Sequence, residues 1–177
     1  IKNFDNREFK VVIQSGEFLL KTNQKNTFLL NLIGVSYAKI KNYNKAQVYF
    51  EKAIENNPNI SDYYNNLGAT LNDMSKFKDA LFPLKKAVLI NPSYYQALDN
   101  LGNSYRELFD FKLSQDFHIA AINLNPSYYE ACSNLGLSYV YDGKYDLALK
   151  ILDKSINLNP NYSPSHVNKA LCYFRIG

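Results

Sequence analysis

The sequence contains no tryptophan, two cysteines and one methionine among its 177 residues. The cysteines, Cys132 and Cys172, are too far apart to match a metal-binding motif, and they form no disulfide framework. No apolar run approaches the roughly 20 residues that a membrane-spanning helix needs. Two isolated cysteines weakly favour a reducing compartment, so we expect a cytoplasmic protein with no part in a membrane.

The sequence also lacks a strong excess of one charge. Its 20 Lys and Arg residues and 16 Asp and Glu residues give a formal net charge of +4 at pH 7. Nucleic-acid binders usually concentrate positive charge on one face, and a mild overall excess does not predict that function. Hydrophobic residues make up 46% of the chain, which is ordinary for a folded domain and argues against intrinsic disorder.

Motifs for catalysis are missing as well. The sequence has no glycine-rich phosphate loop and no arrangement of serine, histidine and aspartate at a nucleophile spacing. The two histidines, His118 and His166, have no cysteine or aspartate at a metal or nucleophile spacing, so we expect both to be structural. We therefore predict that these residues contain no catalytic group, no cofactor site and no metal site.

The dominant feature that is present is an internal repeat. The pair Asn-Pro recurs with a constant spacing of 34 residues, at Asn57, Asn91, Asn125 and Asn159. The triplet Asn-Leu-Gly recurs with the same spacing, at Asn66, Asn100 and Asn134. Two independent series with one period predict a chain of supersecondary units that stack on one another.

The repeat period divides the chain into units. Complete units are predicted over 27–60, 61–94, 95–128 and 129–162. Residues 5–26 are expected to form the second helix of a preceding unit, and residues 163–177 the first helix of a following one. Because the sequence starts with Ile1 rather than Met and stops within a unit, we expect both natural ends to lie outside it. The whole of 1–177 is predicted to be a single array.

Each unit has the pattern of two short amphipathic helices. Apolar residues such as Tyr64, Leu67 and Leu71 recur on one helical face, and glycine lies in that face at Gly34, Gly68, Gly102 and Gly136. Glycine costs a helix about 1 kcal/mol relative to alanine, so its position predicts the close approach of another helix. The second helix should end near each Asn-Pro, because proline disfavours the helical conformation in the residue before it. Ser93 with Gln96, and Ser127 with Glu130, match capping boxes for the next helix.

These residues resemble the tetratricopeptide repeat. The family pattern appears here as Leu98, Leu101, Gly102 and Tyr105, and the unit closes with Pro126. The resemblance covers almost the whole chain and implies an all-α, right-handed solenoid of antiparallel helical hairpins. It also implies a concave groove, lined by the first helix of each unit, that binds a peptide or an extended segment of a partner protein.

The resemblance places specific residues in that groove. In the first two units they include Val35, Ala38, Lys39, Ala69 and Asp73. The peptide-binding set that we predict is Asn65, Asn66, Asn72, Asp99, Asn100, Asn103, Arg106, Asn134, Tyr141 and Asn168. The row Asn66, Asn100, Asn134 and Asn168 is similar to the asparagine ladder of O-linked N-acetylglucosamine transferases, where an amide can hold a peptide backbone through both its donor and its acceptor. The alternative is that asparagine at this position belongs to the general repeat pattern.

Three functions are compatible with these features. The first is an interaction scaffold for a protein or peptide partner, with no catalytic residue of its own and no nucleic-acid ligand. The second is the recognition arm of a larger glycosyl-, sulfo- or methyltransferase whose catalytic domain lies outside these residues. The third is end-to-end self-association through the terminal helices.

Overall fold

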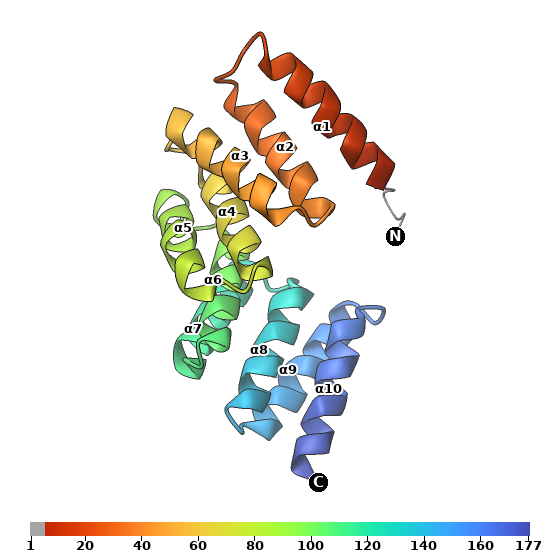
Figure 1. The fold of residues 1–177 in the computed structure, drawn as a ribbon. Coiled ribbons are helices and arrows are strands. Elements are labelled where there is room, and N and C mark those ends of the chain that lie inside the picture. Colours follow the sequence, from red (N-terminus) through yellow and green to blue (C-terminus); the bar gives the residue numbers. More distant parts are fainter. Residues whose placement is uncertain (1–5) are drawn as a thin grey trace. The chain divides into compact units, whose positions relative to one another are not determined.

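The computed structural model describes residues 6–177. In that range the chain forms ten α-helices and no strand, with short turns between consecutive helices (Figure 1). The predicted all-α helical-repeat fold is confirmed. Residue 5 of the predicted segment 5–26, like residues 1–4 of the predicted array, lies outside the described range. None of the helices in residues 6–177 has both the length and the apolar character that crossing a membrane requires.

The chain divides into two compact units, residues 1–91 and residues 92–177. The helices of the first unit are α1 (Asn6–Leu20), α2 (Thr27–Lys39), α3 (Tyr43–Asn56), α4 (Ser61–Asp73) and α5 (Phe77–Ile90). Helices α2 and α3 form one hairpin, and α4 and α5 form the next. Helix α1 packs on α2, and α3 packs on α4, so the hairpins stack side by side within this unit.

The second unit repeats this arrangement. Its helices are α6 (Tyr95–Glu107), α7 (Phe111–Leu124), α8 (Tyr129–Tyr141), α9 (Tyr145–Leu158) and α10 (Ser163–Ile176). Helices α6 and α7 form a hairpin, as do α8 and α9, and α10 packs against both α8 and α9. Each predicted complete repeat therefore contains one hairpin, while the limits between repeats stay a prediction.

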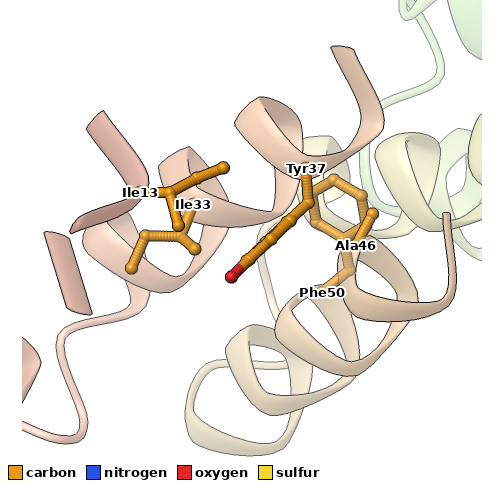
Figure 2. Packing of buried hydrophobic residues seen from close by; sticks show 5 residues of the cluster. All are labelled: Ile13, Ile33, Tyr37, Ala46 and Phe50. Carbon is orange, nitrogen blue, oxygen red and sulfur yellow. The ribbon is translucent and has the colours of Figure 1, made fainter. Parts of the chain in front are cut away.

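The core of the first unit shows why one hairpin is not enough. Ile13 of α1, Ile33 and Tyr37 of α2, and Ala46 and Phe50 of α3 pack together and are buried (Figure 2). No single pair of helices encloses this cluster, because its members come from three successive helices. Stacking of neighbours therefore creates the core, as in other repeat proteins.

The glycines of the first helices lie where another helix comes close. A Cβ atom built on Gly34 would lie 2.6 Å from Cε1 of Phe50, and one on Gly136 would lie 2.5 Å from Cγ of Leu152. Both distances are far shorter than a normal contact between carbon atoms. The predicted close approach is confirmed, and its partner is a large buried side chain of the second helix.

The turn inside each hairpin contains one residue in the left-handed conformation. These residues are spaced by the repeat period and have φ values of 61°, 59°, 62° and 74°, at Lys41, Ser75, Phe109 and Gly143. After α8, for example, the backbone N–H of Lys144 donates to the carbonyl of Tyr139 at 2.9 Å. This bond is typical of a helix that ends on a left-handed residue. Three of the four turns have a residue other than glycine at this position, although the left-handed conformation usually costs such residues about 1–2 kcal/mol.

The second helices end at the Asn-Pro pairs, as predicted. The side chain of Asn125 then shapes the following turn, because its Oδ1 accepts hydrogen bonds from the backbone N–H of Ser127 at 3.2 Å and from its hydroxyl at 2.8 Å. The predicted capping boxes at Ser93 and Ser127 are wrong: α6 and α8 begin after Tyr94 and Tyr128, without a side-chain cap. For Ser127 the physical reason is that its hydroxyl is directed back to Asn125.

Candidate functional site

The surface between the first helices of two neighbouring hairpins is hollowed in the first unit. An open depression of about 190 Å³ lies between α2 and α4. Its lining residues are Val35, Ala38, Lys39, Phe50, Asn66, Ala69, Thr70 and Asp73. All of them except Phe50 and Thr70 occupy positions at which the family resemblance predicts a groove.

The depression combines apolar walls with a few polar groups. Val35, Ala38 and Ala69 supply the apolar surface, and Lys39 and Asp73 supply charges of opposite sign. Partial burial raises the pKa of Asp73, and the positive charge of Lys39 acts in the opposite direction. The hollow therefore has a mostly apolar lining with a few polar groups, as binding pockets commonly have.

The predicted asparagine row links neighbouring hairpins. The Nδ2 atom of Asn66 donates to Oδ1 of Asn31 at 2.9 Å, and that of Asn168 donates to the backbone carbonyl of Ser133 at 3.2 Å. Asn134 makes the corresponding bonds to both carboxylate oxygens of Asp99, at 3.2 and 3.0 Å. In each case the acceptor lies 35 residues earlier in the chain. These bonds give Asn66, Asn134 and Asn168 a structural role, so their amides would meet a ligand only with their remaining donors and acceptors.

Asp99 is the centre of a buried polar cluster in the second unit. Its side chain is buried, and Oδ1 lies 2.7 Å from Nδ1 of His118 on α7. Besides the two bonds from Asn134, Oδ2 accepts a longer bond of 3.4 Å from the hydroxyl of Tyr128. Burial raises the pKa of Tyr128, and the negative charge of Asp99 raises it further. Asp99 is thus held by protein groups on several sides, as a buried polar group requires.

His118 has an aspartate beside it in the structure, although the sequence shows none at a nucleophile or metal spacing. Asp99 and His118 are 19 residues apart in sequence, and the hairpin of α6 and α7 brings them together. The Nε2 atom of His118 is buried and has no hydrogen-bond partner among the described residues. Sequence reasoning missed the pair because it searched for close spacings along the chain and not across the hairpin.

The remaining predicted site residues differ in their exposure. Asn65 is buried in α4, whereas Asn72 of α4 and Asn100 of α6 are partly buried. Arg106 donates to Oδ1 of Asn103 at 2.9 Å and also pairs with the carboxylate of Glu107, so these residues form one polar group. Tyr141 is 49% exposed and stacks on Phe111, with ring centroids 6.3 Å apart.

The described residues, 6–177, contain no cluster of side chains suited to a metal ion. No three side chains of the His, Cys, Asp or Glu type gather there closely enough to bind an ion. Cys132 and Cys172 are free and buried, and burial raises the pKa of both thiols. Buried thiols with raised pKa values are poor nucleophiles.

Comparison with models of known protein families identifies the family of this chain. Three models described as tetratricopeptide repeat match residues 28–60, 49–82 and 129–162. The chain belongs to the tetratricopeptide repeat family. As a tetratricopeptide repeat protein, it has the architecture of a protein-interaction scaffold. A comparison with curated proteins finds no significant match.

Several solved structures have the same fold, and two of them are described as TPR proteins. YrrB, described as a TPR protein with an unusual peptide-binding site, has a TM-score of 0.74 at 23% identity, over 93% of this chain and 84% of its own. The thermophilic TPR protein TTC0263 of Thermus thermophilus has a TM-score of 0.78 at 20% identity, over 94% and 91%. PilF of Pseudomonas aeruginosa has a TM-score of 0.76 at 22% identity, over 85% and 68%. At these identities the likeness shows the fold alone.

Proposed function

We propose that this tetratricopeptide repeat protein binds an extended peptide segment of a partner protein between α2 and α4. The observation that carries the proposal is the depression of about 190 Å³, which has apolar walls, an amide and one charge of each sign. An extended chain alternates its side chains, so one small apolar side chain can enter the hollow while the backbone meets Asn66. The described peptide-binding site of YrrB supports the same kind of ligand.

The hydrogen-bonding capacity of Asn66 is compatible with this role. Its bond to Asn31 uses one hydrogen of the Nδ2 atom, and an amide carries a second hydrogen and an acceptor oxygen. In the second unit we propose a corresponding role for Asn103, Arg106 and Tyr141, which are partly or half exposed. The buried Asp99 and Asn168 would then support the surface from behind without touching the ligand.

The experiment starts from a library of random decapeptides displayed on phage and selected against the wild-type protein. Dissociation constants of the selected peptides are then measured by fluorescence polarisation with wild type, Ala69→Arg and a matched control, Ala170→Arg. Ala69 lines the depression, whereas Ala170 is an exposed residue of α10. We expect Ala69→Arg to weaken binding at least tenfold and Ala170→Arg to change it less than about twofold, since a 1.4 kcal/mol loss is tenfold. Equal affinities for all three proteins would contradict the proposal.

The sequence-based alternative of a transferase recognition arm depends on the asparagine row and stays a hypothesis. The cytoplasmic location and end-to-end self-association stay predictions in the same way.

A further inference from the structure

A second polar cluster lies in the first unit, away from the residues that line the proposed groove. Oε1 of Glu17 on α1 accepts a hydrogen bond of 2.8 Å from the hydroxyl of Tyr37 on α2 and another of 2.8 Å from the hydroxyl of Tyr49 on α3. The two tyrosine rings stack with centroids 5.5 Å apart. Three successive helices are thus joined through one carboxylate.

Lysines surround this cluster. Nζ of Lys45 lies 3.3 Å from the hydroxyl of Tyr37 and 5.0 Å from the centre of its ring, and Nζ of Lys52 lies 5.7 Å from the ring centre of Tyr49. Within residues 6–177 neither lysine forms an ion pair with a carboxylate. The rings therefore hold the ammonium groups over an aromatic surface and leave them open to an anion.

Two open depressions adjoin Tyr49. One has a volume of about 420 Å³ and the other about 340 Å³. Both are lined by Glu17, Tyr49 and Lys52, the first also by Lys21 and the second also by Lys45. Three lysines and one glutamate leave this surface with an excess of positive charge.

Tyr37 and Lys52 have like residues in later repeats, at Tyr105 and Tyr139 and at Lys86 and Lys154, but Tyr49 and Lys45 do not. The positions that correspond to Tyr49 in the later repeats hold Pro83, Phe117 and Ile151, none of which has a hydroxyl group. Those that correspond to Lys45 hold Asp79, Leu113 and Leu147. The combination of the Tyr49 hydroxyl with Lys45 is therefore particular to the first hairpin, although all four hairpins have the same fold.

We propose that the surface formed by α1 and α3 around Tyr49 binds an acidic peptide segment of a protein partner. Lys45 and Lys52 are seven residues apart on one helix, which separates them by about 10 Å along its axis. In a peptide in the polyproline II conformation, which has three residues per turn, carboxylates three residues apart lie on one face and are separated by about 9 Å. Charge complementarity favours an acidic peptide, because the lysines attract carboxylates. A nucleic acid is disfavoured, because Glu17 would repel its phosphates and the positive surface is too short for a long phosphate backbone.

The test uses a fluorescein-labelled peptide of eight glutamates as the probe, with oligolysine and single-stranded oligothymidine of the same length as comparison probes. Fluorescence polarisation is measured with wild type, with Lys45→Glu/Lys52→Glu, and with the control Lys112→Glu/Lys150→Glu, which makes the same change of net charge at exposed lysines of α7 and α9. We expect the first double variant to weaken oligoglutamate binding at least tenfold and the control to weaken it less than threefold. The milder variant Lys45→Gln/Lys52→Gln gives the same direction if charge reversal disturbs the fold, which circular dichroism reports.

Three results would overturn the proposal. They are a wild type that does not bind oligoglutamate at low salt, an equal loss of binding in both charge-reversed variants, and oligothymidine binding as tight as oligoglutamate binding. The Ala69→Arg variant separates this surface from the proposed groove, because it should leave oligoglutamate binding unchanged whether or not the groove binds a peptide.

Discussion

The Nδ1 atom of His118 lies 2.7 Å from the Oδ1 atom of Asp99, and both side chains are buried. Both residues depart from the repeat pattern in the same hairpin. The equivalents of His118 in the other repeats are Phe50, Leu84 and Leu152, and those of Asp99 are Asn31, Asn65 and Ser133. His118 replaces an apolar residue of the repeat, and Asp99, which replaces an uncharged residue, supplies its hydrogen-bond partner.

We expect His118→Leu to destabilise the protein although leucine is the residue of two sibling repeats. The variant removes the shortest hydrogen bond of Asp99 and leaves the carboxylate in a buried site, which costs about 2 kcal/mol. Urea unfolding measures the loss. The double variant Asp99→Asn/His118→Leu restores both repeat-like residues and should recover part of the loss, whereas a double variant as unstable as the single one would show that the bond contributes little.

The left-handed turns make a second prediction. Ser75 is exposed and has a φ of 59°, so Ser75→Gly should stabilise the protein by about 0.5–1 kcal/mol. Gly143→Ala should destabilise it by about 1 kcal/mol, and only through the backbone, because a Cβ atom there would meet nothing within 4 Å. Thermal unfolding of the two variants should shift in opposite directions, and a shift in the same direction would contradict this account of the turns.

Gly136→Ala tests the close approach of two helices. Alanine favours a helix over glycine by about 1 kcal/mol, but its Cβ atom would lie 2.5 Å from Cγ of Leu152. Overpacking of a well-filled core costs about 1–3 kcal/mol, so we expect a net destabilisation. Chemical denaturation measures the sign, and a net gain of stability would show that Leu152 moves aside at little cost.

The bond between neighbouring hairpins makes a fourth prediction. Asn168 is buried and donates to both the backbone carbonyl and the hydroxyl oxygen of Ser133. Asn168→Ala should therefore cost about 1–2 kcal/mol. Amide hydrogen exchange should locate the loss of protection in α10, and an even loss across all helices would argue against a local link.

The carboxyl group of Asp73 predicts a dependence on pH. Partial burial raises its pKa above the ordinary 3.8, so the folded state binds the proton more tightly than the unfolded state. Tighter proton binding by Asp73 in the folded state adds to the free energy of unfolding. This contribution is complete below pH 3.8 and is lost as the pH rises through the folded pKa. Asp73→Asn should therefore raise stability near pH 7 and reduce its change with pH, as urea unfolding between pH 3 and pH 7 would show; the gain is at most a few tenths of a kcal/mol, because solvent screens this exposed group. A lower stability of the variant at pH 7 would contradict the sign.

Much of the fold followed from periodicity. The spacing of Asn-Pro predicted the ends of the second helices, and glycine in an apolar helical face predicted close packing such as that of Gly34 on Phe50. Both are local rules that one repeat shares with the next. Capping was mispredicted because Asn125 competes for the hydroxyl of Ser127, and a spacing rule does not include that competitor.

The candidate sites were less predictable because they depend on departures from the repeat. His118 and Asp99 lie far apart in sequence, and only the comparison of equivalent positions would have shown that both change in one hairpin. The same comparison singles out Tyr49 and Lys45. The left-handed turns were visible only at Gly143, because lysine, serine and phenylalanine at the equivalent positions carry no signal for that conformation.

In three members of the asparagine row, Asn66, Asn134 and Asn168, the amide reaches one equivalent position 35 residues earlier, whether that position holds asparagine, aspartate or serine. All three residues have an oxygen atom that can accept a hydrogen bond from the asparagine Nδ2 atom. Duplication or loss of a whole 34-residue segment that holds this asparagine would consequently preserve a donor and an acceptor at the new junction. Arrays of different lengths could then arise by recombination without redesign of the contacts between modules.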